Sequence, residues 1–208
     1  MKIGKVVRCI ILIIASVFFV FPLYWMVTGS FKLPIEIWAS PPKWIPSAIR
    51  FNNYTHLFAT KPVLRWSLNS LLTSVIAVFF IVISSAAAGY GYGKKRFPGS
   101  KVLFGLVVAT MMMPNQVTLV PLYRLAIKLG LVNTYAGLIL PAIAFPFGVF
   151  IVRQFVATIP DEILEAAKID GAGELRLFLV IIVPMIVPAL GALAIFAFMH
   201  VWNDYLWQ

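Results

Sequence analysis

The hydrophobic positions of the chain fall into five long runs, and charged residues flank each run rather than interrupt it. A helix that crosses a bilayer needs about 20 mostly apolar residues, and each run is long enough. A closed β-barrel would show short alternating segments instead. The pattern therefore predicts an all-α polytopic membrane protein with five transmembrane helices, at about 9–31, 67–93, 102–123, 133–153 and 177–203.

The composition agrees with a membrane protein and excludes two other classes. Of the 208 residues, 62% are hydrophobic and 12% are charged, whereas a soluble domain averages roughly 45–50% apolar and about 25% charged residues. Disorder requires low hydrophobicity and is excluded as well. One cysteine cannot form an internal disulfide, and His56 and His200 lie far apart in the sequence. We therefore expect no metal site and no catalytic residue.

Basic residues set the expected orientation. Three of them precede the first run, and the segment 93–101 carries four and no acidic residue. Because Lys and Arg concentrate in cytoplasmic loops, we expect the N-terminus and 93–101 in the cytoplasm of a bacterial-type inner membrane. The first run is too long for a typical signal-peptide core, so an uncleaved helix is favoured over a signal peptide. The net charge of +10 then needs no nucleic acid, and part of it suits anionic membrane lipid.

The segment 32–66 is expected outside. It is rich in proline and tryptophan, which favours an extended stretch along the membrane interface. Two interpretations stay open, a lid over the helix bundle and a contact with an external partner.

The cytoplasmic segment 158–176 holds five of the seven acidic residues of the chain. Thr158 is a candidate N-cap, Pro160 suits a first turn, and Gly171 suits the left-handed residue that ends a helix. The pattern predicts a short helix at about 160–170. A helix of about ten residues is marginal alone in water, so it must dock. It could dock against its own bundle and the lipid surface, or into a separate cytoplasmic protein.

This segment also contains a longer motif, Glu165-Ala166-Ala167, three residues, Gly171, nine residues, Ile181, one residue, then Val183-Pro184. The motif resembles the EAA loop of ABC-importer permeases, with Val183 in place of leucine. Further stretches resemble the carbohydrate-uptake branch, in particular the second permease of maltose-type importers, and they extend over the whole chain: 41–46 with 51–54, 128–135, 159–172 and 202–207.

The resemblance implies a single permease domain over 1–208, with the helix at about 160–170 acting as a coupling helix in a groove of a cytoplasmic ATPase dimer. ATP and Mg would bind that partner and no cofactor this chain, and ATP-driven closure would produce alternating access. A second permease subunit and an extracytoplasmic substrate-binding protein are the other implied partners. The branch usually has a sixth span after 202–207, so we favour a C-terminally truncated chain over a natural five-span variant. The implied ATPase-coupling residues are Glu165, Ala166, Ala167, Asp170, Gly171 and Pro184.

Polar residues inside the predicted spans are candidates for the substrate path, because polar groups in a membrane are costly. Asn115 and Gln116 follow Pro114 in the third span, and amides suit sugar hydroxyls. Trp202, Asn203 and Asp204 follow His200 at the end of the fifth. The alternatives are hydrogen bonds between helices and an interfacial aromatic belt. Small residues at 84–93 are expected to allow close helix packing rather than to touch substrate.

Two other classes compete with the importer permease. An ion-gradient-driven secondary transporter needs ionisable groups within the membrane, and the five runs contain no Asp, Glu, Lys or Arg between their flanking charges before Asp204. A membrane scaffold stays an alternative. A membrane enzyme is disfavoured, since the sequence has neither H-E-x-x-H nor G-x-S-x-G. It also lacks the P-loop pattern, which agrees with an ATPase on a separate chain. A sugar, a polyol and a glycerol phosphate all remain possible substrates.

Overall fold

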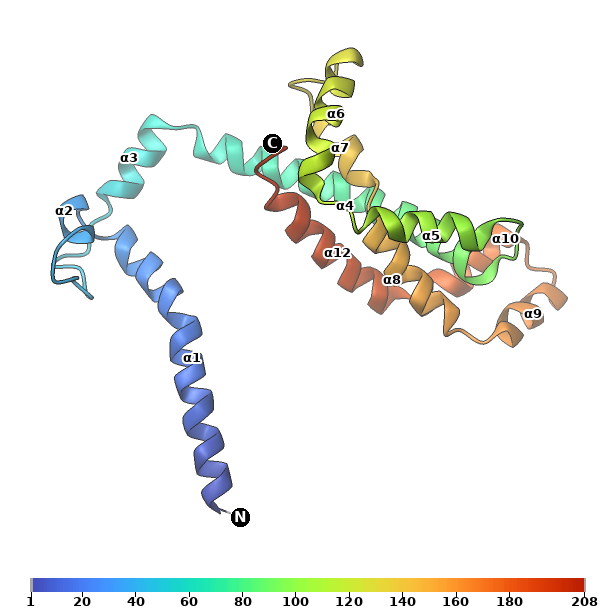
Figure 1. Cartoon of the computed structure of the whole chain (residues 1–208), viewed down its shortest axis with the longest axis horizontal. Helices are drawn as coiled ribbons and strands as arrows, with labels where there is room; N and C mark the ends of the chain where they lie inside the picture. The colour runs from blue at the N-terminus through green and yellow to red at the C-terminus, as the bar shows by residue number, and fades with distance from the viewer. Residues whose placement is uncertain (1, 208) are drawn as a thin grey trace. The chain divides into compact units, whose positions relative to one another are not determined.

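The computed structural model describes the chain from Lys2 to Trp207, except for the side chains of residues 2, 3 and 115. Every element of regular structure in that range is helical (Figure 1). The chain divides into two units, Met1–Trp66 and Ser67–Gln208, called unit 1 and unit 2 below. Each unit is described by itself.

Unit 1 contains α1 (Lys2–Ser30), α2 (Pro34–Ile37), α3 (Asn52–Thr60) and the first residues of α4 (Val63–Lys94). Unit 2 contains the rest of α4 and all later elements. These are α5 (Ser100–Thr110), α6 (Asn115–Lys128), α7 (Tyr135–Ile143), α8 (Pro146–Ala157), α9 (Asp161–Ile169), α10 (Glu174–Arg176), the π-helix η1 (Leu177–Ile182), α11 (Val183–Met185) and α12 (Val187–Trp202).

The apolar runs form helices, but three of the five predicted spans are interrupted. Among the described residues, Gly4–Ser30 and Val63–Lys94 are each long and apolar enough to cross a membrane. Two further pairs qualify only when taken together, α7 with α8, bent by 40°, and Glu174–Met185 with α12, bent by 76°. The structure thus confirms an all-α protein with two to four candidate spans, and the count of five is not confirmed.

The predicted span 102–123 forms two helices, α5 and α6, with a break at 111–114. Pro114 explains the break, because proline has no N–H to donate and disfavours helical geometry in the residue before it. Pro146 begins α8 and Pro188 lies in the first turn of α12, at the other two breaks. Proline suits these positions, since the first turn of a helix leaves its N–H groups without intrahelical partners.

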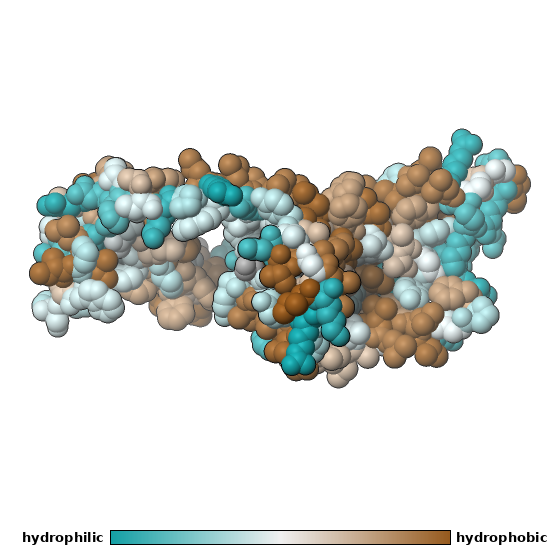
Figure 2. Space-filling model, turned by 90° about the horizontal axis from the view of Figure 1, so that it is seen from above, coloured by the Kyte–Doolittle hydropathy of each residue, from teal (hydrophilic) through white to brown (hydrophobic). Residues whose placement is uncertain are grey.

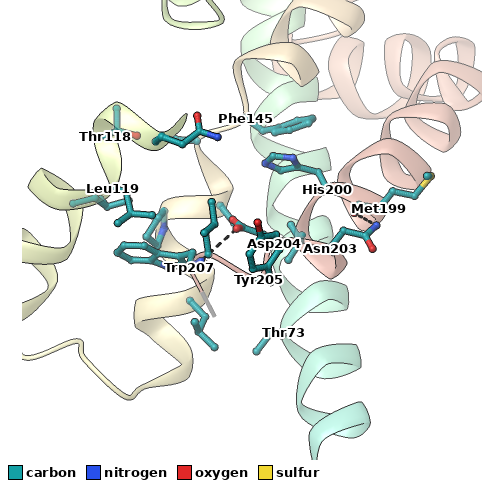
Figure 3. A pocket seen from close by; sticks show the side chains of 18 residues that line it. Thr73, Thr118, Leu119, Phe145, Met199, His200, Asn203, Asp204, Tyr205 and Trp207 are labelled. Atoms are coloured by element: carbon teal, nitrogen blue, oxygen red, sulfur yellow. Dashed lines mark hydrogen bonds between the residues drawn. The ribbon is translucent and has the colours of Figure 1, made fainter. Parts of the chain in front are cut away.

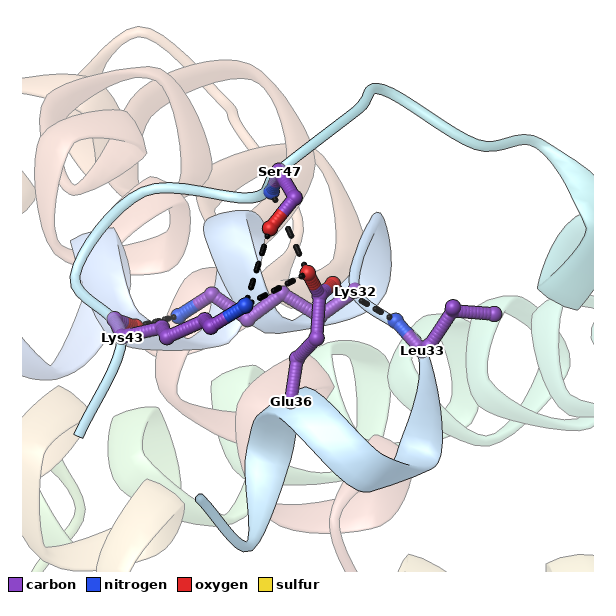
Figure 4. Close-up of polar contacts among 5 residues, drawn as sticks. All are labelled: Lys32, Leu33, Glu36, Lys43 and Ser47. Carbon is purple, nitrogen blue, oxygen red and sulfur yellow. Dashed lines mark hydrogen bonds and ion pairs between the residues drawn. The ribbon is translucent and has the colours of Figure 1, made fainter. Parts of the chain in front are cut away.

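Unit 1 is held at the end of α1 by a network around two buried charged residues (Figure 4). The Lys32 ammonium donates to the carbonyl oxygen of Lys43 at 2.6 Å. The Glu36 carboxylate accepts the N–H of Leu33 at 3.1 Å and that of Ser47 at 3.4 Å, and it pairs with Lys43 at 3.5 Å. Hydrogen bonding with Ser47, then with Leu33, lowers the pKa of Glu36 from 4.5 to about 2.

The prediction of an extended stretch over 32–66 is only partly correct, because the segment contains the helices α2 and α3. Pro34 occupies the first turn of α2, and Glu36 accepts the Leu33 N–H at its start. Both features favour a helical turn. The loop after α2 returns to α1, where the Tyr24 hydroxyl donates to the carbonyl oxygen of Trp44 at 2.9 Å.

In unit 2, α4 packs closely against α8 through two stripes of residues spaced four apart. Residues at this spacing share one face of a helix. A Cβ built on Gly89 would lie 2.6 Å from the Val152 side chain, and one on Gly93 would lie 2.8 Å from that of Val156. The stripes are Ser85, Gly89 and Gly93 on α4 and Gly148, Val152 and Val156 on α8. The prediction of close packing is confirmed for Gly89 and Gly93, whereas a Cβ on Gly91 would meet nothing within 4 Å.

The core of unit 2 lies between α4, α8, η1 and α12. Its buried members include Ile81, Val152, Ile182 and Leu193, each fully shielded from solvent. Much of the visible surface is nevertheless hydrophobic (Figure 2). Such a surface suits contact with lipid or with other membrane subunits.

Candidate functional site

The predicted cytoplasmic helix exists as α9, which connects α8 to α10 at one end of unit 2 (Figure 1). Asp161 and Glu162 lie in its first turn and Lys168 in its last, the arrangement that the helix dipole favours. The predicted cap is wrong. Pro160 occupies the N-cap position, and the Thr158 hydroxyl instead donates to the carbonyl oxygen of Phe155. The hydroxyl of Thr158 meets an acceptor within α8, so it is not used at the start of α9.

The end of α9 is as predicted. Gly171 has φ +80°, the left-handed geometry that suits glycine. The N–H of Ala172 donates to the carbonyl of Ala167 at 2.9 Å, and the N–H of Gly171 donates to that of Lys168 at 3.0 Å. This pair of bonds is a Schellman motif, which satisfies carbonyls at a helix end. Asp170 is the C-cap residue that precedes the turn.

The two faces of α9 differ. Leu164 is 6% exposed and belongs to the core of unit 2. Glu165 and Ala166 are exposed, and Ile169 is 86% exposed. The structure thus brings Glu165, Ala166, Asp170 and the Gly171 turn together on one exposed segment, with Ala167 half-buried beside them. Pro184 lies apart from α9, in α11 directly after the π-helix.

Two lysines at the end of α4 contact the segment that contains α9. The Lys94 ammonium donates to the carbonyl oxygen of Ile159 and forms an ion pair with Asp161 at 2.6 Å. The Lys95 ammonium forms an ion pair with Glu174, which also accepts the Tyr90 hydroxyl at 3.1 Å. Two of the five clustered acids are therefore paired with the basic segment 93–101.

The pKa shifts at these pairs agree with the contacts. The hydrogen bond from Lys94 lowers the pKa of Asp161, and the hydrogen bond from Lys95 lowers the pKa of Glu174. Partial burial works to lower the pKa of Lys95, but the bonds with Glu174 and Tyr90 outweigh it and raise that pKa. All three shifts favour the charged forms that the ion pairs need.

A cavity of about 460 Å³ lies at the other end of unit 2, between α6, α7 and the end of α12 (Figure 3). Of the predicted path residues, it brings together Gln116, Asn203 and Asp204. Trp202 is not among the lining residues, and its ring stacks on Phe198 at 5.5 Å. The side chain of Asn115 lies outside the described residues.

The lining also contains residues that were not predicted from the sequence as path residues, including Thr73, Phe145 and Trp207. Phe145 packs against the His200 ring at 5.3 Å. The Trp207 indole donates to the carbonyl of Gly137 at 2.9 Å, which holds its ring at the cavity. In the view of Figure 3, the Trp207 ring lies on one side of the Asp204 carboxylate, and the His200 ring, with Phe145 beyond it, lies on the other. Thr73 and Trp207 are far apart in the sequence, so the sequence carried no signal that would join them.

The polar groups of the cavity lining can donate and accept hydrogen bonds. Asp204 contributes the one carboxylate among its described lining residues, and none of those residues is Lys or Arg. Amide, hydroxyl and imidazole groups and aromatic faces make up the rest of its polar and ring surface. Such a lining fits an uncharged ligand with many hydroxyl groups better than it fits an anion.

Residues 81–208 match the family described as "Binding-protein-dependent transport system inner membrane component". The match covers more than half of the chain, and the chain belongs to this family. It is a permease subunit of an ABC importer, a multi-pass protein of the inner membrane, and ATP hydrolysis belongs to a separate chain. The family implies an ATPase and a substrate-binding protein as partners.

Curated relatives agree with the family. The arabinooligosaccharides transport system permease protein AraQ of Halalkalibacterium halodurans is 36% identical over 192 residues, which are 90% of this chain and 68% of the relative. The diacetylchitobiose uptake system permease protein NgcG of Streptomyces coelicolor is 35% identical over 94% of this chain and 65% of the relative. The sn-glycerol-3-phosphate transport system permease protein UgpE of Rhizobium meliloti is 35% identical over 99% of this chain and 75% of the relative.

A solved structure supports the fold. It is described as the crystal structure of a bacterial ABC transporter involved in the import of the acidic polysaccharide alginate, and one of its chains matches with a TM-score of 0.81. The match covers 98% of this chain and 72% of that chain, at 22% identity.

Membership of the permease family excludes the competing classes, namely a secondary transporter, a scaffold and a membrane enzyme.

Proposed function

We propose that this permease imports a carbohydrate and that a cytoplasmic ATPase dimer drives it through the segment 158–176. The observation that carries the coupling role is α9, a short helix that presents Glu165, Ala166 and Ile169 outward. The exposed surface of α9 carries Ile169, which is 86% exposed, and the carboxylate of Glu165. Such a surface suits a groove of a partner that contains apolar and basic groups. Ala166 and Ala167 permit close approach, and Gly171 turns the chain back toward the membrane.

The cavity supports a neutral saccharide as the substrate. Among the relatives, AraQ and NgcG are named for oligosaccharides and UgpE for a glycerol phosphate. The cavity has a carboxylate and, among its described lining, neither lysine nor arginine, which disfavours a phosphate or a uronate. Gln116, Asn203 and Asp204 would bind sugar hydroxyls, and the ring of Trp207 would stack on a sugar face. Asn115 and Trp202 stay candidate path residues on sequence grounds.

The proposed topology has five spans, a cytoplasmic N-terminus and one permease domain over 1–208. The ion pairs from Lys94 and Lys95 to Asp161 and Glu174 support it, because they place 93–101 and 158–176 at one end of unit 2. A second permease subunit would complete the path, ATP and Mg would bind the ATPase dimer, and lipid would cover the apolar surface.

The experiment that tests this function is a mild-detergent pull-down from native membranes, with partners identified by mass spectrometry. We compare the parent protein, Glu165→Lys and Lys128→Glu, a charge reversal in α6 away from α9. We expect an ATPase subunit with the parent and with Lys128→Glu, and its loss with Glu165→Lys. Equal recovery from all three proteins would refute docking through Glu165, and no ATPase from any of them would refute the coupling role.

A further inference from the structure

Adjacent lysines at the end of α4 hold both sides of the α9 segment. Lys94 contacts its beginning, through the carbonyl of Ile159 and the carboxylate of Asp161. Lys95 contacts the chain after it, through Glu174. Because Lys94 and Lys95 are consecutive, one point on a long helix is tied to the segment on both sides of α9.

These ties matter because α9 has little else to position it. Leu164 is the one buried residue among those of α9. A nine-residue helix is marginal alone in water, so its position depends on tertiary contacts. Ile159 is buried in the same core, just before α9. The contacts of Lys94 therefore fix the point at which the chain leaves the core of unit 2 and enters α9.

We propose that Lys94 and Lys95 are positioning residues that transmit displacement of α9 to α4, so that movement of the segment moves the membrane helix. This proposal rests on the coupling role of 158–176. Packed side chains and ion pairs that link rigid elements can carry coupling between distant sites. Here the ion pairs supply the link between α9 and a helix of 32 residues, α4, that packs along α8.

Lys94 should contribute more than Lys95. The side chain of Lys94 is 7% exposed and that of Lys95 is 33% exposed. Attraction between charges is screened less where solvent is excluded. Lys94 also bonds a backbone carbonyl, which a change of side chain at Asp161 cannot remove. Loss of the Lys94 charge should therefore weaken the transmission of movement from α9 to α4 more than loss of the Lys95 charge.

The test uses the assembled importer and needs no knowledge of its substrate. In a Cys9→Ser background, Tyr205→Cys places one thiol in this chain at the cavity. Its rate of reaction with N-ethylmaleimide is measured with and without ATP and vanadate, beside ATP hydrolysis by the same complex. The single variants are Lys94→Met, Lys94→Arg, Lys94→Asp and Lys95→Met. The charge swap combines Lys94→Asp with Asp161→Lys, and the control is Lys101→Met, at an exposed lysine of the same basic segment.

We expect Lys94→Met to reduce the ATP-dependent change in cysteine reactivity by about 3- to 30-fold, with the ATPase still bound. Lys95→Met should give a smaller reduction, and Lys94→Arg and Lys101→Met should respond like the parent. The charge swap should show a larger ATP-dependent change in cysteine reactivity than Lys94→Asp alone. A full response in Lys94→Met would overturn the inference. The inference would also be overturned if neither the charge swap nor Lys94→Arg restored the ATP-dependent change in cysteine reactivity. A parent protein that does not respond to ATP would instead contradict the proposed function.

Discussion

The close approach of α4 and α8 makes a strong prediction at Gly89. In the variant Gly89→Ala, the new Cβ would lie 2.6 Å from Cγ1 of Val152 and 2.9 Å from the backbone nitrogen of Arg153. Ordinary contacts between carbon atoms are about 3.5–4.0 Å, so the two helices must separate by about 1 Å. Rotation of a side chain cannot relieve the contact with a backbone atom. Overpacking of this kind costs roughly 1–3 kcal/mol.

Gly91 provides the matched control on the same helix. A Cβ on Gly91 would meet nothing within 4 Å, and alanine is better than glycine in a helix by about 0.8–1 kcal/mol. Gly89→Ala gains the same helix propensity, so the two variants should differ in stability by the overpacking cost alone, about 1–3 kcal/mol, with Gly91→Ala above the parent and Gly89→Ala below Gly91→Ala. Fluorescence-detected thermal unfolding of the purified complex in detergent measures this order. If Gly89→Ala unfolds at or above the temperature of Gly91→Ala, the described packing of α4 on α8 is wrong.

Three further outcomes follow from individual sites. The pKa of Glu36 is about 2 in the folded protein against 4.5 ordinarily, so its ionised form stabilises unit 1 above pH 4.5, and this stabilisation is lost as the pH falls toward 2. The unfolding temperature of the parent should therefore fall over that pH range, and Glu36→Gln should lack this contribution to the fall. Gly171→Ala should destabilise the end of α9 by about 1–2 kcal/mol, because Gly171 has φ +80°, whereas Gly173→Ala should not; amide hydrogen exchange of α9 separates the two. Asp204→Ala should raise the KM for uptake of a neutral saccharide about tenfold or more through the loss of a charged hydrogen-bond acceptor, and an unchanged KM would remove Asp204 from the path.

The sequence predicted where helices occur but not how they are interrupted. Runs without charge reveal apolar helices because the cost of burying charge is large and local. They do not show whether a run forms one straight helix. The prolines at 114, 146 and 188 carried that information, since each lies at a break between two helices. Pro114 was expected to interrupt backbone hydrogen bonding, but the number of spans was predicted from the length of the runs alone. That prediction therefore gave single spans where the structure has bent or divided helices.

The helix α9 was predictable because its signals are local. Acidic residues in the first turn and glycine after the last turn mark its bounds to within about one residue of Asp161–Ile169. The cap was not predictable from residue type, because Thr158 had a competing acceptor in α8, the carbonyl of Phe155. The ion pair between Lys94 and Asp161 joins residues 67 positions apart. The pattern of basic residues explained Lys94 as a topological signal and contained no information about its partner.

The two candidate sites of unit 2 lie at opposite ends of the same packed helices, and this arrangement explains how they can communicate. Lys94 ties the α9 segment to the end of α4, and the stripe that ends at Gly93 packs α4 against α8 directly beside that tie. Gly148, near the start of α8, meets both Ser85 of α4 and Leu193 of α12, the helix that leads to His200 and the cavity. Close-packed helices resist gradual deformation and move as bodies. Displacement at α9 is therefore expected to reach the cavity through movement of α4, α8 and α12 together, and loosening the Gly89 contact should weaken the response of the cavity even where Lys94 is intact.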